Sequence, residues 1–380
     1  MLRCLHLADL HLGWSPSELP GDKARTRQHE RDLLLKRAVD FALAPDNRIN
    51  MVVIAGDLFE SHRPDPAVAE EAVRQLGRLA RAGVFLVTVP GNHDEITYHD
   101  SVYRQRGDSW PGVLVRNPMP EMVASQSLNG TRVFVYSLAY TGGLTRTDEL
   151  QSLPRAAEPG IHIGVFHGSL DWDAGDRSLP IASQALAAAE YHYVALGHIH
   201  KHGKFKVGKG LAVYPGMVEA KGFDDPGTGE LTVVEFSDTG AVVAVKTSPL
   251  PVRKHVSAEI DVSAVPSHDA LVDACRATTG ADSDALVRIT LKGVPPFAID
   301  VDALASSLQG EFFSVEVVDE TTFLSDELGR QLASEPTVRG YFVRRVMAKL
   351  EHAADERERK VLELAMRKGL AAFQGRGNKR

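Results

Sequence analysis

The sequence predicts an α/β fold: a layered domain of mixed β-sheets flanked by helices, then a small α/β capping domain and a C-terminal helical tail. Three observations predict it. Short apolar runs alternate with helical stretches through the first 250 residues, the pattern resets near Pro249 and Pro251, and a basic helical segment follows Pro336. Alternating strands and helices that end in a hairpin are typical of layered domains. We expect domains at 1–250, 251–325 and 326–380.

The elements of the first part are predicted from apolar periodicity and turn residues. Pro64 and Pro66 stand just before one expected helix and Gly83 just after it, as is usual at helix ends. The turn 237–240 separates the two strands of a hairpin, 231–236 and 241–246. The other expected strands are 2–7, 51–55, 84–89, 132–139, 161–166 and 193–196, and the helices are 26–43 and 67–82.

The last 130 residues predict two further pieces. Strands at 253–260, 286–291 and 312–318 alternate with helices at 268–277 and 301–308, which gives a compact β-α-β-α-β unit. The tail carries two apolar stripes at helical spacing and no evident core, so partner binding competes with a solvated helix face. The stripes are Val338, Phe342, Val346 and Leu350, then Leu362, Ala365, Met366, Gly369 and Phe373.

The composition is that of a globular protein, with 43% hydrophobic and 24% charged residues, which excludes wholesale disorder. The formal net charge is −7, but residues 336–380 hold 12 Lys or Arg and 5 Asp or Glu and so carry +7. The preceding 335 residues therefore carry −14. This distribution excludes nucleic-acid binding by a uniformly basic surface and leaves the tail as a contact surface.

Two cysteines are too few for a disulfide framework or a cysteine zinc module, whereas there are 15 histidines. A bound metal would therefore be held by imidazole and carboxylate. The first residues, MLRCLHLADLHLGW, lack the pattern of a signal peptide, and no run of 18 apolar residues occurs. We expect a cytoplasmic protein without a membrane segment.

Five short segments each follow an apolar run and contain metal-ligand residue types: ADLH, GD, GNHD, FHG and GHIH. Because sites in α/β proteins form at the carboxyl ends of strands, we expect all five at one edge of one sheet. Residues i and i+2 of an extended chain point to one side, so Asp9 with His11, and His198 with His200, would each present two ligands.

The resulting ligand set has two Asp, one Asn and four His side chains, which is too many for one four-coordinate zinc. It suits two divalent metal ions about 3.5–4 Å apart that share one carboxylate. Mixed oxygen and nitrogen ligands favour Mn(II), Fe(II) or Zn(II) over Ca(II). The predicted ligands are Asp9, His11, Asp57, Asn92, His167, His198 and His200.

In this order, ADLHLG, GDLFE, GNHD, HG and GHIH resemble the motifs of the calcineurin-like metallophosphoesterases, with a spacing similar to the SbcD branch. SbcD is the nuclease subunit of the SbcC–SbcD DNA repair complex. The resemblance implies that Asp57 bridges the metals and that His93, which is no ligand, protonates the leaving oxygen. It implies manganese most often, with Fe(II), Zn(II) or Mg(II) as alternatives. The first metal would take Asp9, His11 and His200, and the second Asn92, His167 and His198.

The resemblance further implies a DNA exonuclease, 3′→5′ in polarity, with single-strand endonuclease activity. It implies a homodimer, a DNA-binding capping domain, and a tail that docks on an SbcC-type ATPase. Two alternatives stay open: a phosphodiesterase or phosphatase for small molecules such as cyclic nucleotides, which the acidic body favours, and a subunit whose main role is docking.

Two departures from the family pattern bear on substrate positioning. Some relatives carry a phosphate-positioning histidine after GDLF, where this chain has Glu60, with His62 two residues on. The segment MVEAKGFDD after Tyr214-Pro215-Gly216 resembles SbcD-like paralogues more than SbcD itself. Asp94 is a candidate to orient its neighbour His93.

Overall fold

The computed structural model describes residues 1–142, 153–155, 157–172, 178–225, 227–297, 299–322 and 326–374. The chain divides into two compact units, Met1–Val252 and Arg253–Arg380, which are described one at a time. Among the described residues, no helix has the length and apolar character needed to cross a membrane.

The first sheet of unit 1 has three parallel central strands, β1 (Leu2–Leu7), β2 (Met51–Ala55) and β3 (Phe85–Val89). All but Arg3 of these residues are buried, as expected of apolar strands covered on both faces. β4 (Val113–Leu114) extends one edge, and the antiparallel hairpin β13 (Glu230–Phe236) and β14 (Val242–Pro249) extends the other. The strand order is β14-β13-β1-β2-β3-β4.

The second sheet has the order β11-β12-β10-β7-β6-β5 and is also mixed. The two central strands, β7 (Ile161–His167) and β10 (Tyr193–Gly197), are parallel. The sequence did not predict three of its strands: the partly polar edge strands β5 and β11, and the short strand β12 between β11 and β10. The remaining strands are β5 (Glu121–Leu128), β6 (Thr131–Ser137), β11 (Gly203–Val207) and β12 (Gly210–Tyr214).

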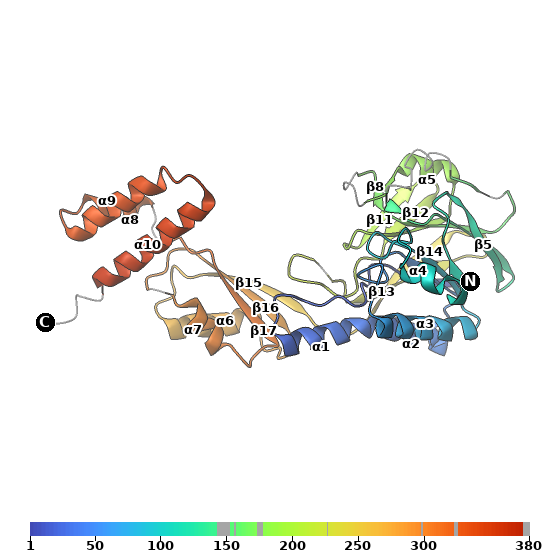
Figure 1. The fold of residues 1–380 in the computed structure, drawn as a ribbon, viewed down its shortest axis with the longest axis horizontal. Coiled ribbons are helices and arrows are strands. Elements are labelled where there is room, and N and C mark those ends of the chain that lie inside the picture. The colour runs from blue at the N-terminus through green and yellow to red at the C-terminus, as the bar shows by residue number, and fades with distance from the viewer. Residues whose placement is uncertain are drawn as a thin grey trace. The chain divides into compact units, whose positions relative to one another are not determined.

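The two sheets pack face to face between helices, so unit 1 has four layers (Figure 1). Side chains of β6 show the alternation: Val133 and Val135 join the core between the sheets, whereas Phe134 and Tyr136 pack toward α5 (Ser183–Ala189). Helices α2 (Leu34–Leu43) and α3 (Pro66–Arg81) add their apolar faces to the first core. The predicted α/β architecture of mixed sheets flanked by helices is confirmed.

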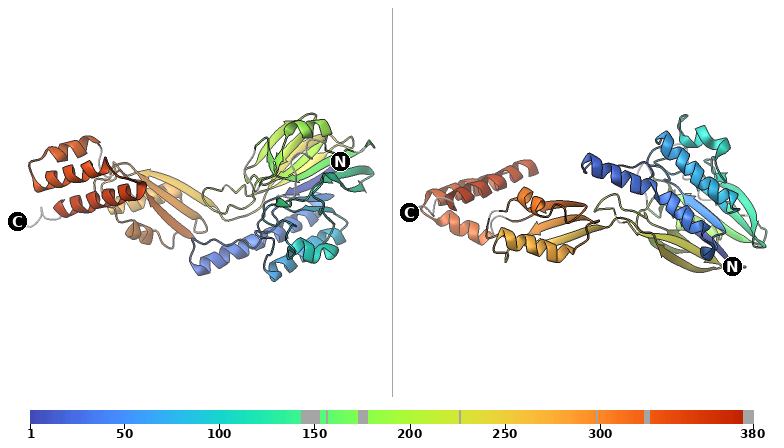
Figure 2. Two further views of the ribbon diagram at one scale, coloured as in Figure 1. Left: turned by 45° about the horizontal axis from the view of Figure 1, so that its top comes forward. Right: turned by 90° about the horizontal axis from the view of Figure 1, so that it is seen from below.

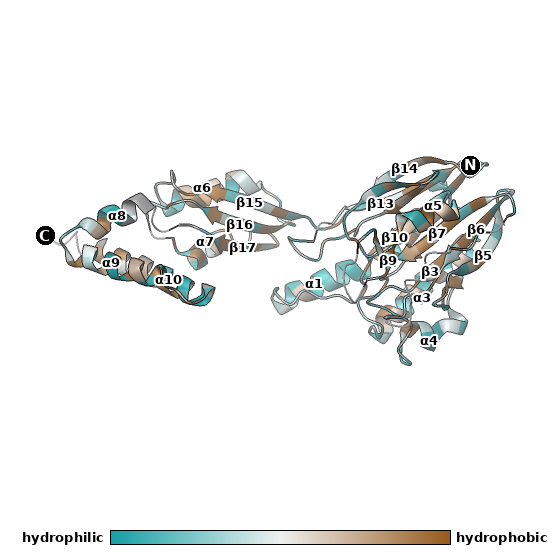
Figure 3. Ribbon diagram, turned by 90° about the horizontal axis from the view of Figure 1, so that it is seen from above, coloured by the Kyte–Doolittle hydropathy of each residue, from teal (hydrophilic) through white to brown (hydrophobic). Residues whose placement is uncertain are grey.

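The helix expected at 26–43 is two helices, α1 (Gly21–Asp32) and α2, separated at Leu33. α1 begins directly after Pro20, five residues earlier than predicted. The length of α1 was underestimated because this helix buries two arginines, Arg27 and Arg31, instead of an apolar stripe. Figure 3 shows the contrast: α1 is hydrophilic along its length, while the strands of unit 1 are mostly hydrophobic.

Shorter elements complete unit 1. They are the helix α4 (Val102–Arg106), the 3₁₀ turns η1 (Pro45–Asn47) and η2 (Gly107–Ser109), and the small sheet of β8 (Ser169–Leu170) and β9 (Pro180–Ile181).

Unit 2 opens with a parallel three-stranded sheet of β15 (His255–Asp261), β16 (Leu286–Lys292) and β17 (Ser314–Asp319). Two connecting helices, α6 (His268–Thr279) and α7 (Val301–Ser307), pack their apolar residues into one core with the sheet. The β-α-β-α-β order follows the sequence pattern. Three helices follow, α8 (Asp326–Ser334), α9 (Val338–Leu350) and α10 (Glu356–Gln374), and they gather in one group (Figure 2).

The apolar stripes of the tail do have a core, contrary to the expectation from sequence. Val343, Val346, Met366 and Leu370 are buried together, with Phe342 packed against them. Gly369 leaves room for the Phe342 ring, because a Cβ at this glycine would overlap that ring. A smaller apolar set stays exposed: Val338, Tyr341, Val361, Leu364 and Phe373.

Candidate metal centre

The eight predicted site residues follow five strands that belong to two sheets. Asp9 and His11 follow β1, Asp57 follows β2, and Asn92 and His93 follow β3 of the first sheet. In the second sheet, His167 ends β7, and His198 and His200 follow β10. The expectation of one edge of one sheet is therefore wrong. Because the sheets are stacked, the carboxyl ends of their central strands meet, and these residues come together there.

The i, i+2 pairs converge for a different reason from the one predicted. Asp9, His11 and His198 are not extended but have positive φ angles of 54°, 49° and 95°, and Asp57 has 49°. Backbone hydrogen bonds hold this conformation, from Asp9 N to Gly56 O (3.1 Å) and from His11 N to Asp57 O (3.0 Å). Left-handed backbone at non-glycine residues costs energy, and such residues tend to cluster at functional sites.

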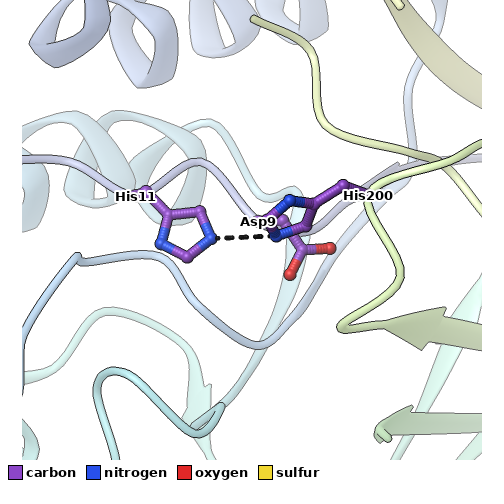
Figure 4. A group of neighbouring side chains, drawn as sticks. All are labelled: Asp9, His11 and His200. Carbon is purple, nitrogen blue, oxygen red and sulfur yellow. Dashed lines mark hydrogen bonds between the residues drawn. The ribbon is translucent and has the colours of Figure 1, made fainter. Parts of the chain in front are cut away.

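Asp9, His11 and His200 form a first group, whose ligand atoms lie within 4.8 Å of one another (Figure 4). The two imidazoles approach through their Nε2 atoms, 3.3 Å apart. Each Nδ1 faces a carboxylate: His11 Nδ1 lies 2.8 Å from Glu60 Oε2, and His200 Nδ1 lies 2.8 Å from Asp225 Oδ1. The hydrogen bond to Asp225 holds a proton on Nδ1 of His200, and the charge of Glu60 favours a proton on Nδ1 of His11, so the two Nε2 atoms face each other beside Asp9.

Asn92, His167 and His198 form a second group. Asn92 Oδ1 lies 2.9 Å from both His167 Nε2 and His198 Nδ1. His167 Nδ1 donates to the carbonyl oxygen of Ala55 at 2.9 Å, which turns its Nε2 toward the group. Asp57 lies between the two groups, since its Oδ2 is 3.4 Å from His167 Nε2 and 3.8 Å from His11 Nε2.

Burial sets the electrostatics of the cluster. It raises the pKa of Asp9 to about 6 and lowers the pKa values of His11 and His198 to about 4. Burial also opposes ionisation of Asp57, but His167 holds the pKa of this carboxyl well below its ordinary value. The pKa of His167 rises to about 9, because the Asp57 charge outweighs burial. Two buried carboxylates with inward-facing imidazole lone pairs are the donor set that transition-metal dications require, so these residues fit two such ions.

Asp57 also positions the segment that carries His93. Its Oδ1 accepts a hydrogen bond from the backbone N–H of His93 at 2.8 Å. The chain approaches so closely at Gly91 that a Cβ there would overlap the Asp57 carboxylate. His93 Nδ1 lies 3.1 Å from the carbonyl oxygen of Glu60, and its side chain is 29% exposed.

Asp94 orients the backbone of this segment and not the His93 ring. Its Oδ1 accepts from Gly91 N (2.7 Å), and its Oδ2 accepts from Phe59 N (3.1 Å) and the Tyr103 hydroxyl (2.7 Å). The same carboxyl is fully buried near Asp57, and both effects raise its pKa to about 7. The residue that meets His93 Nδ1 is Glu60.

Sequence reasoning missed the residues that support the ligands. Glu60 was noted only as a departure, and Asp225 and Lys221 lie in the KGFDD segment, where no motif marks them. Lys221 Nζ lies 2.6 Å from Glu60 Oε2, and a tight turn from Gly222 to Asp225 carries the carboxylate that meets His200. In the sequence, the acidic turn that follows Pro215-Gly216 was the one signal that could have indicated these supporting residues.

The four-layer fold and its buried carboxylate–histidine cluster define the class of metal-dependent phosphoesterases. Residues 2–202 match the calcineurin-like phosphoesterase family, and the chain belongs to this family.

Curated relatives match at modest identity. The uncharacterized metallophosphoesterase YhaO of Bacillus subtilis is 24% identical over 238 residues, 60% of this chain and 55% of that protein. The DNA double-strand break repair protein Mre11 of Methanopyrus kandleri is 28% identical over 235 residues, 57% and 49% of the two chains. The chain thus spans about half the length of these relatives. The crystal structure of TT1561 from Thermus thermophilus aligns at 14% identity with a TM-score of 0.37, covering 65% of this chain and 98% of that one.

Proposed function

We propose that this protein is a two-metal phosphodiesterase that acts on DNA, as a 3′→5′ exonuclease with single-strand endonuclease activity. The position of Asp57 carries the proposal. One of its carboxylate oxygens lies between the two ligand groups, and the other holds the backbone of His93. A bridging carboxylate that also fixes a partly exposed histidine is what phosphodiester hydrolysis at a metal pair requires.

The proposed ligands are Asp9, His11 and His200 for one ion and Asn92, His167 and His198 for the other, with Asp57 shared. When bound, the ions, most often Mn(II), would activate water and neutralise charge on the phosphoryl oxygens. With both ring nitrogens protonated, His93 would donate its Nδ1–H to the carbonyl oxygen of Glu60 and pass its Nε2 proton to the leaving oxygen, becoming a neutral imidazole. Glu60 and Asp225 keep His11 and His200 in the tautomer that binds through Nε2.

DNA is the proposed substrate for two reasons. Several relatives, including that of Methanopyrus kandleri, are named DNA double-strand break repair proteins. The chain also carries a second unit that a small substrate does not require. We assign residues 251–325 to DNA binding and residues 326–380 to docking on an SbcC-type ATPase, through the exposed apolar residues of α9 and α10. A cytoplasmic homodimer is part of the same proposal.

A small-molecule phosphodiesterase is the second candidate, because the body of the protein is acidic. Residues 1–335 carry a formal charge of −14, which disfavours approach of a polyanion. The metal ions would offset only the charge at the site itself.

One experiment separates the two candidates. The manganese-loaded protein is given labelled duplex DNA, single-stranded DNA and bis-p-nitrophenyl phosphate in parallel. We expect cleavage of all three and loss of all three in Asp57→Ala. Hydrolysis of the small ester without any DNA cleavage would favour the second candidate. Deletion of residues 336–380 should abolish co-purification with the ATPase and preserve ester hydrolysis.

A further inference from the structure

Lys221 is a cation at the candidate metal centre that no ligand role explains. Its ammonium group lies 2.6 Å from Glu60 Oε2, the same oxygen that lies 2.8 Å from His11 Nδ1. The Lys221 side chain is 16% exposed and that of Glu60 is 30% exposed, so the pair lies at the boundary between the buried cluster and solvent. Among the described residues, Glu60 is the one hydrogen-bond partner of the Lys221 ammonium group. An ammonium group has three donors, so two remain available.

Lys221 is held in place by buried arginines of α1. Arg31 donates to the carbonyl oxygens of Glu219 and Ala220, both at 2.9 Å, and Arg27 pairs with the Glu219 carboxylate. The next residue is Lys221. Both arginine side chains are almost fully buried, so this anchor is rigid. Two buried arginines thus fix the backbone directly before Lys221, which is unusual for a lysine that serves only solubility.

The charges around Lys221 indicate what its ammonium group could bind. Asp9, Asp57, Glu60 and Asp225 supply four negative charges when ionised, which two dications would offset. Lys221 adds a positive charge to this set of groups, placed beside the Glu60 carboxylate and therefore near His93.

We propose that Lys221 forms an anion subsite that binds a non-bridging oxygen of the substrate phosphate, with Glu60 as its positioning residue. This inference rests on the proposed phosphodiesterase function and names the group that recognises the phosphate. Its ligand class is any phosphate mono- or diester, with inorganic phosphate as the simplest member.

The test uses the full-length protein loaded with manganese and compares four variants. Lys221→Met removes the charge at similar volume, Lys221→Arg keeps it, and Glu60→Gln breaks the pair. Lys209→Met is the matched control, because Lys209 also pairs with a glutamate but is 87% exposed. Calorimetry gives the Kd of inorganic phosphate, a manganese titration gives metal stoichiometry and affinity, and thermal melting checks folding.

We expect Lys221→Met to weaken phosphate binding about 10- to 100-fold, the value of a lost hydrogen bond to a charged group, with manganese affinity unchanged. Lys221→Arg should restore binding to within about threefold of the wild type, and Lys209→Met should match the wild type. Glu60→Gln should weaken manganese binding as well, because Glu60 also faces His11.

Two outcomes overturn the inference alone: Lys221→Met binds phosphate as the wild type does, or it weakens manganese binding as much as Glu60→Gln does. The second would show that Lys221 acts only by neutralising Glu60. In both, the wild type still hydrolyses phosphodiesters. A wild-type protein that neither hydrolyses them nor binds phosphate overturns the proposed function together with the inference.

Discussion

The Nε2 atoms of His11 and His200 lie 3.3 Å apart, and the Nδ1 atom of each ring faces a carboxylate at 2.8 Å. Two imidazoles held in this tautomer point lone pairs at each other, an arrangement that a shared cation stabilises. The carboxylates Glu60 and Asp225 therefore belong to the candidate metal centre, although neither is a proposed ligand.

Removing either carboxylate should weaken metal binding. We expect Glu60→Gln and Asp225→Asn each to reduce manganese affinity about 10- to 100-fold, because the ring orientation and basicity of the histidine behind it are lost. A titration against a competing chelator measures the effect. Glu190→Gln, which changes a half-exposed carboxylate paired with Lys209, is the control and should bind manganese normally. Equal affinities in all three would contradict the supporting role.

The proposed acid, His93, should matter more for poor leaving groups. We expect His93→Ala to slow DNA cleavage about 10²- to 10⁴-fold, the usual contribution of a general acid. Hydrolysis of bis-p-nitrophenyl phosphate should fall much less, because p-nitrophenolate leaves without a proton. Steady-state rates on both substrates measure the difference, with His352→Ala in the tail as control. The same loss on both substrates would mean that His93 has another role.

Gly91 should tolerate no side chain. A Cβ there would overlap the Asp57 carboxylate and backbone, so Gly91→Ala must displace the residue proposed to bridge the metals. We expect a loss of about 1–3 kcal/mol in unfolding free energy, as for an overpacked core, together with loss of metal binding. Chemical denaturation and metal titration measure both. Gly21→Ala, at a helix start where a Cβ would meet only the end of the Arg25 side chain at 3.6 Å, should be neutral; a neutral Gly91→Ala would show that the loop relaxes easily.

The metal-free protein should lose stability in acid through His6. This residue is fully buried on β1, its Nδ1 lies 2.8 Å from the Tyr193 hydroxyl, and burial lowers its pKa from 6.5 to about 3. Because the folded-state pKa lies below the unfolded one, the stability from the neutral ring is fully present above pH 6.5. It is lost as pH falls from 6.5 toward 3.

His6→Gln keeps the hydrogen-bonding capacity and removes the titration. Below pH 6.5, we expect unfolding free energies of the wild type to fall more steeply than those of the variant, by up to about 1.4 kcal/mol per pH unit. Denaturant titrations at several pH values measure both slopes. Parallel slopes would mean that His6 stays neutral or becomes protonated without cost.

The fold and the site were predictable to different depths. Apolar runs place β1, β2 and β3 within a residue of their bounds, because strands buried on both faces must be apolar throughout. The division into two sheets was not predictable in this way, since β7 and β10 are buried and largely apolar like β1 and β2, and strand pairing depends on long-range contacts.

The motifs identified the cluster because Asp, Asn and His after buried strands have no packing role. The supporting residues Lys221 and Asp225 were not predicted, since they lie in a turn without a motif. Their importance comes from the Glu60 and His200 side chains that they contact. The two buried arginines of α1 escaped for the same reason: in sequence they resemble a solvated helix face, and only their partners at Glu219 and Ala220 reveal the anchor.

The central claim is that two metal ions bind at Asp57 and cleave DNA phosphodiesters. Equilibrium dialysis with manganese, followed by digestion of labelled DNA by the same samples, tests it most directly. We predict two ions per wild-type chain with DNA cleavage. In Asp57→Asn we predict loss of at least one ion together with cleavage, and chelation should abolish wild-type cleavage until manganese is restored. DNA cleavage that persists in Asp57→Asn or after chelation would contradict the account.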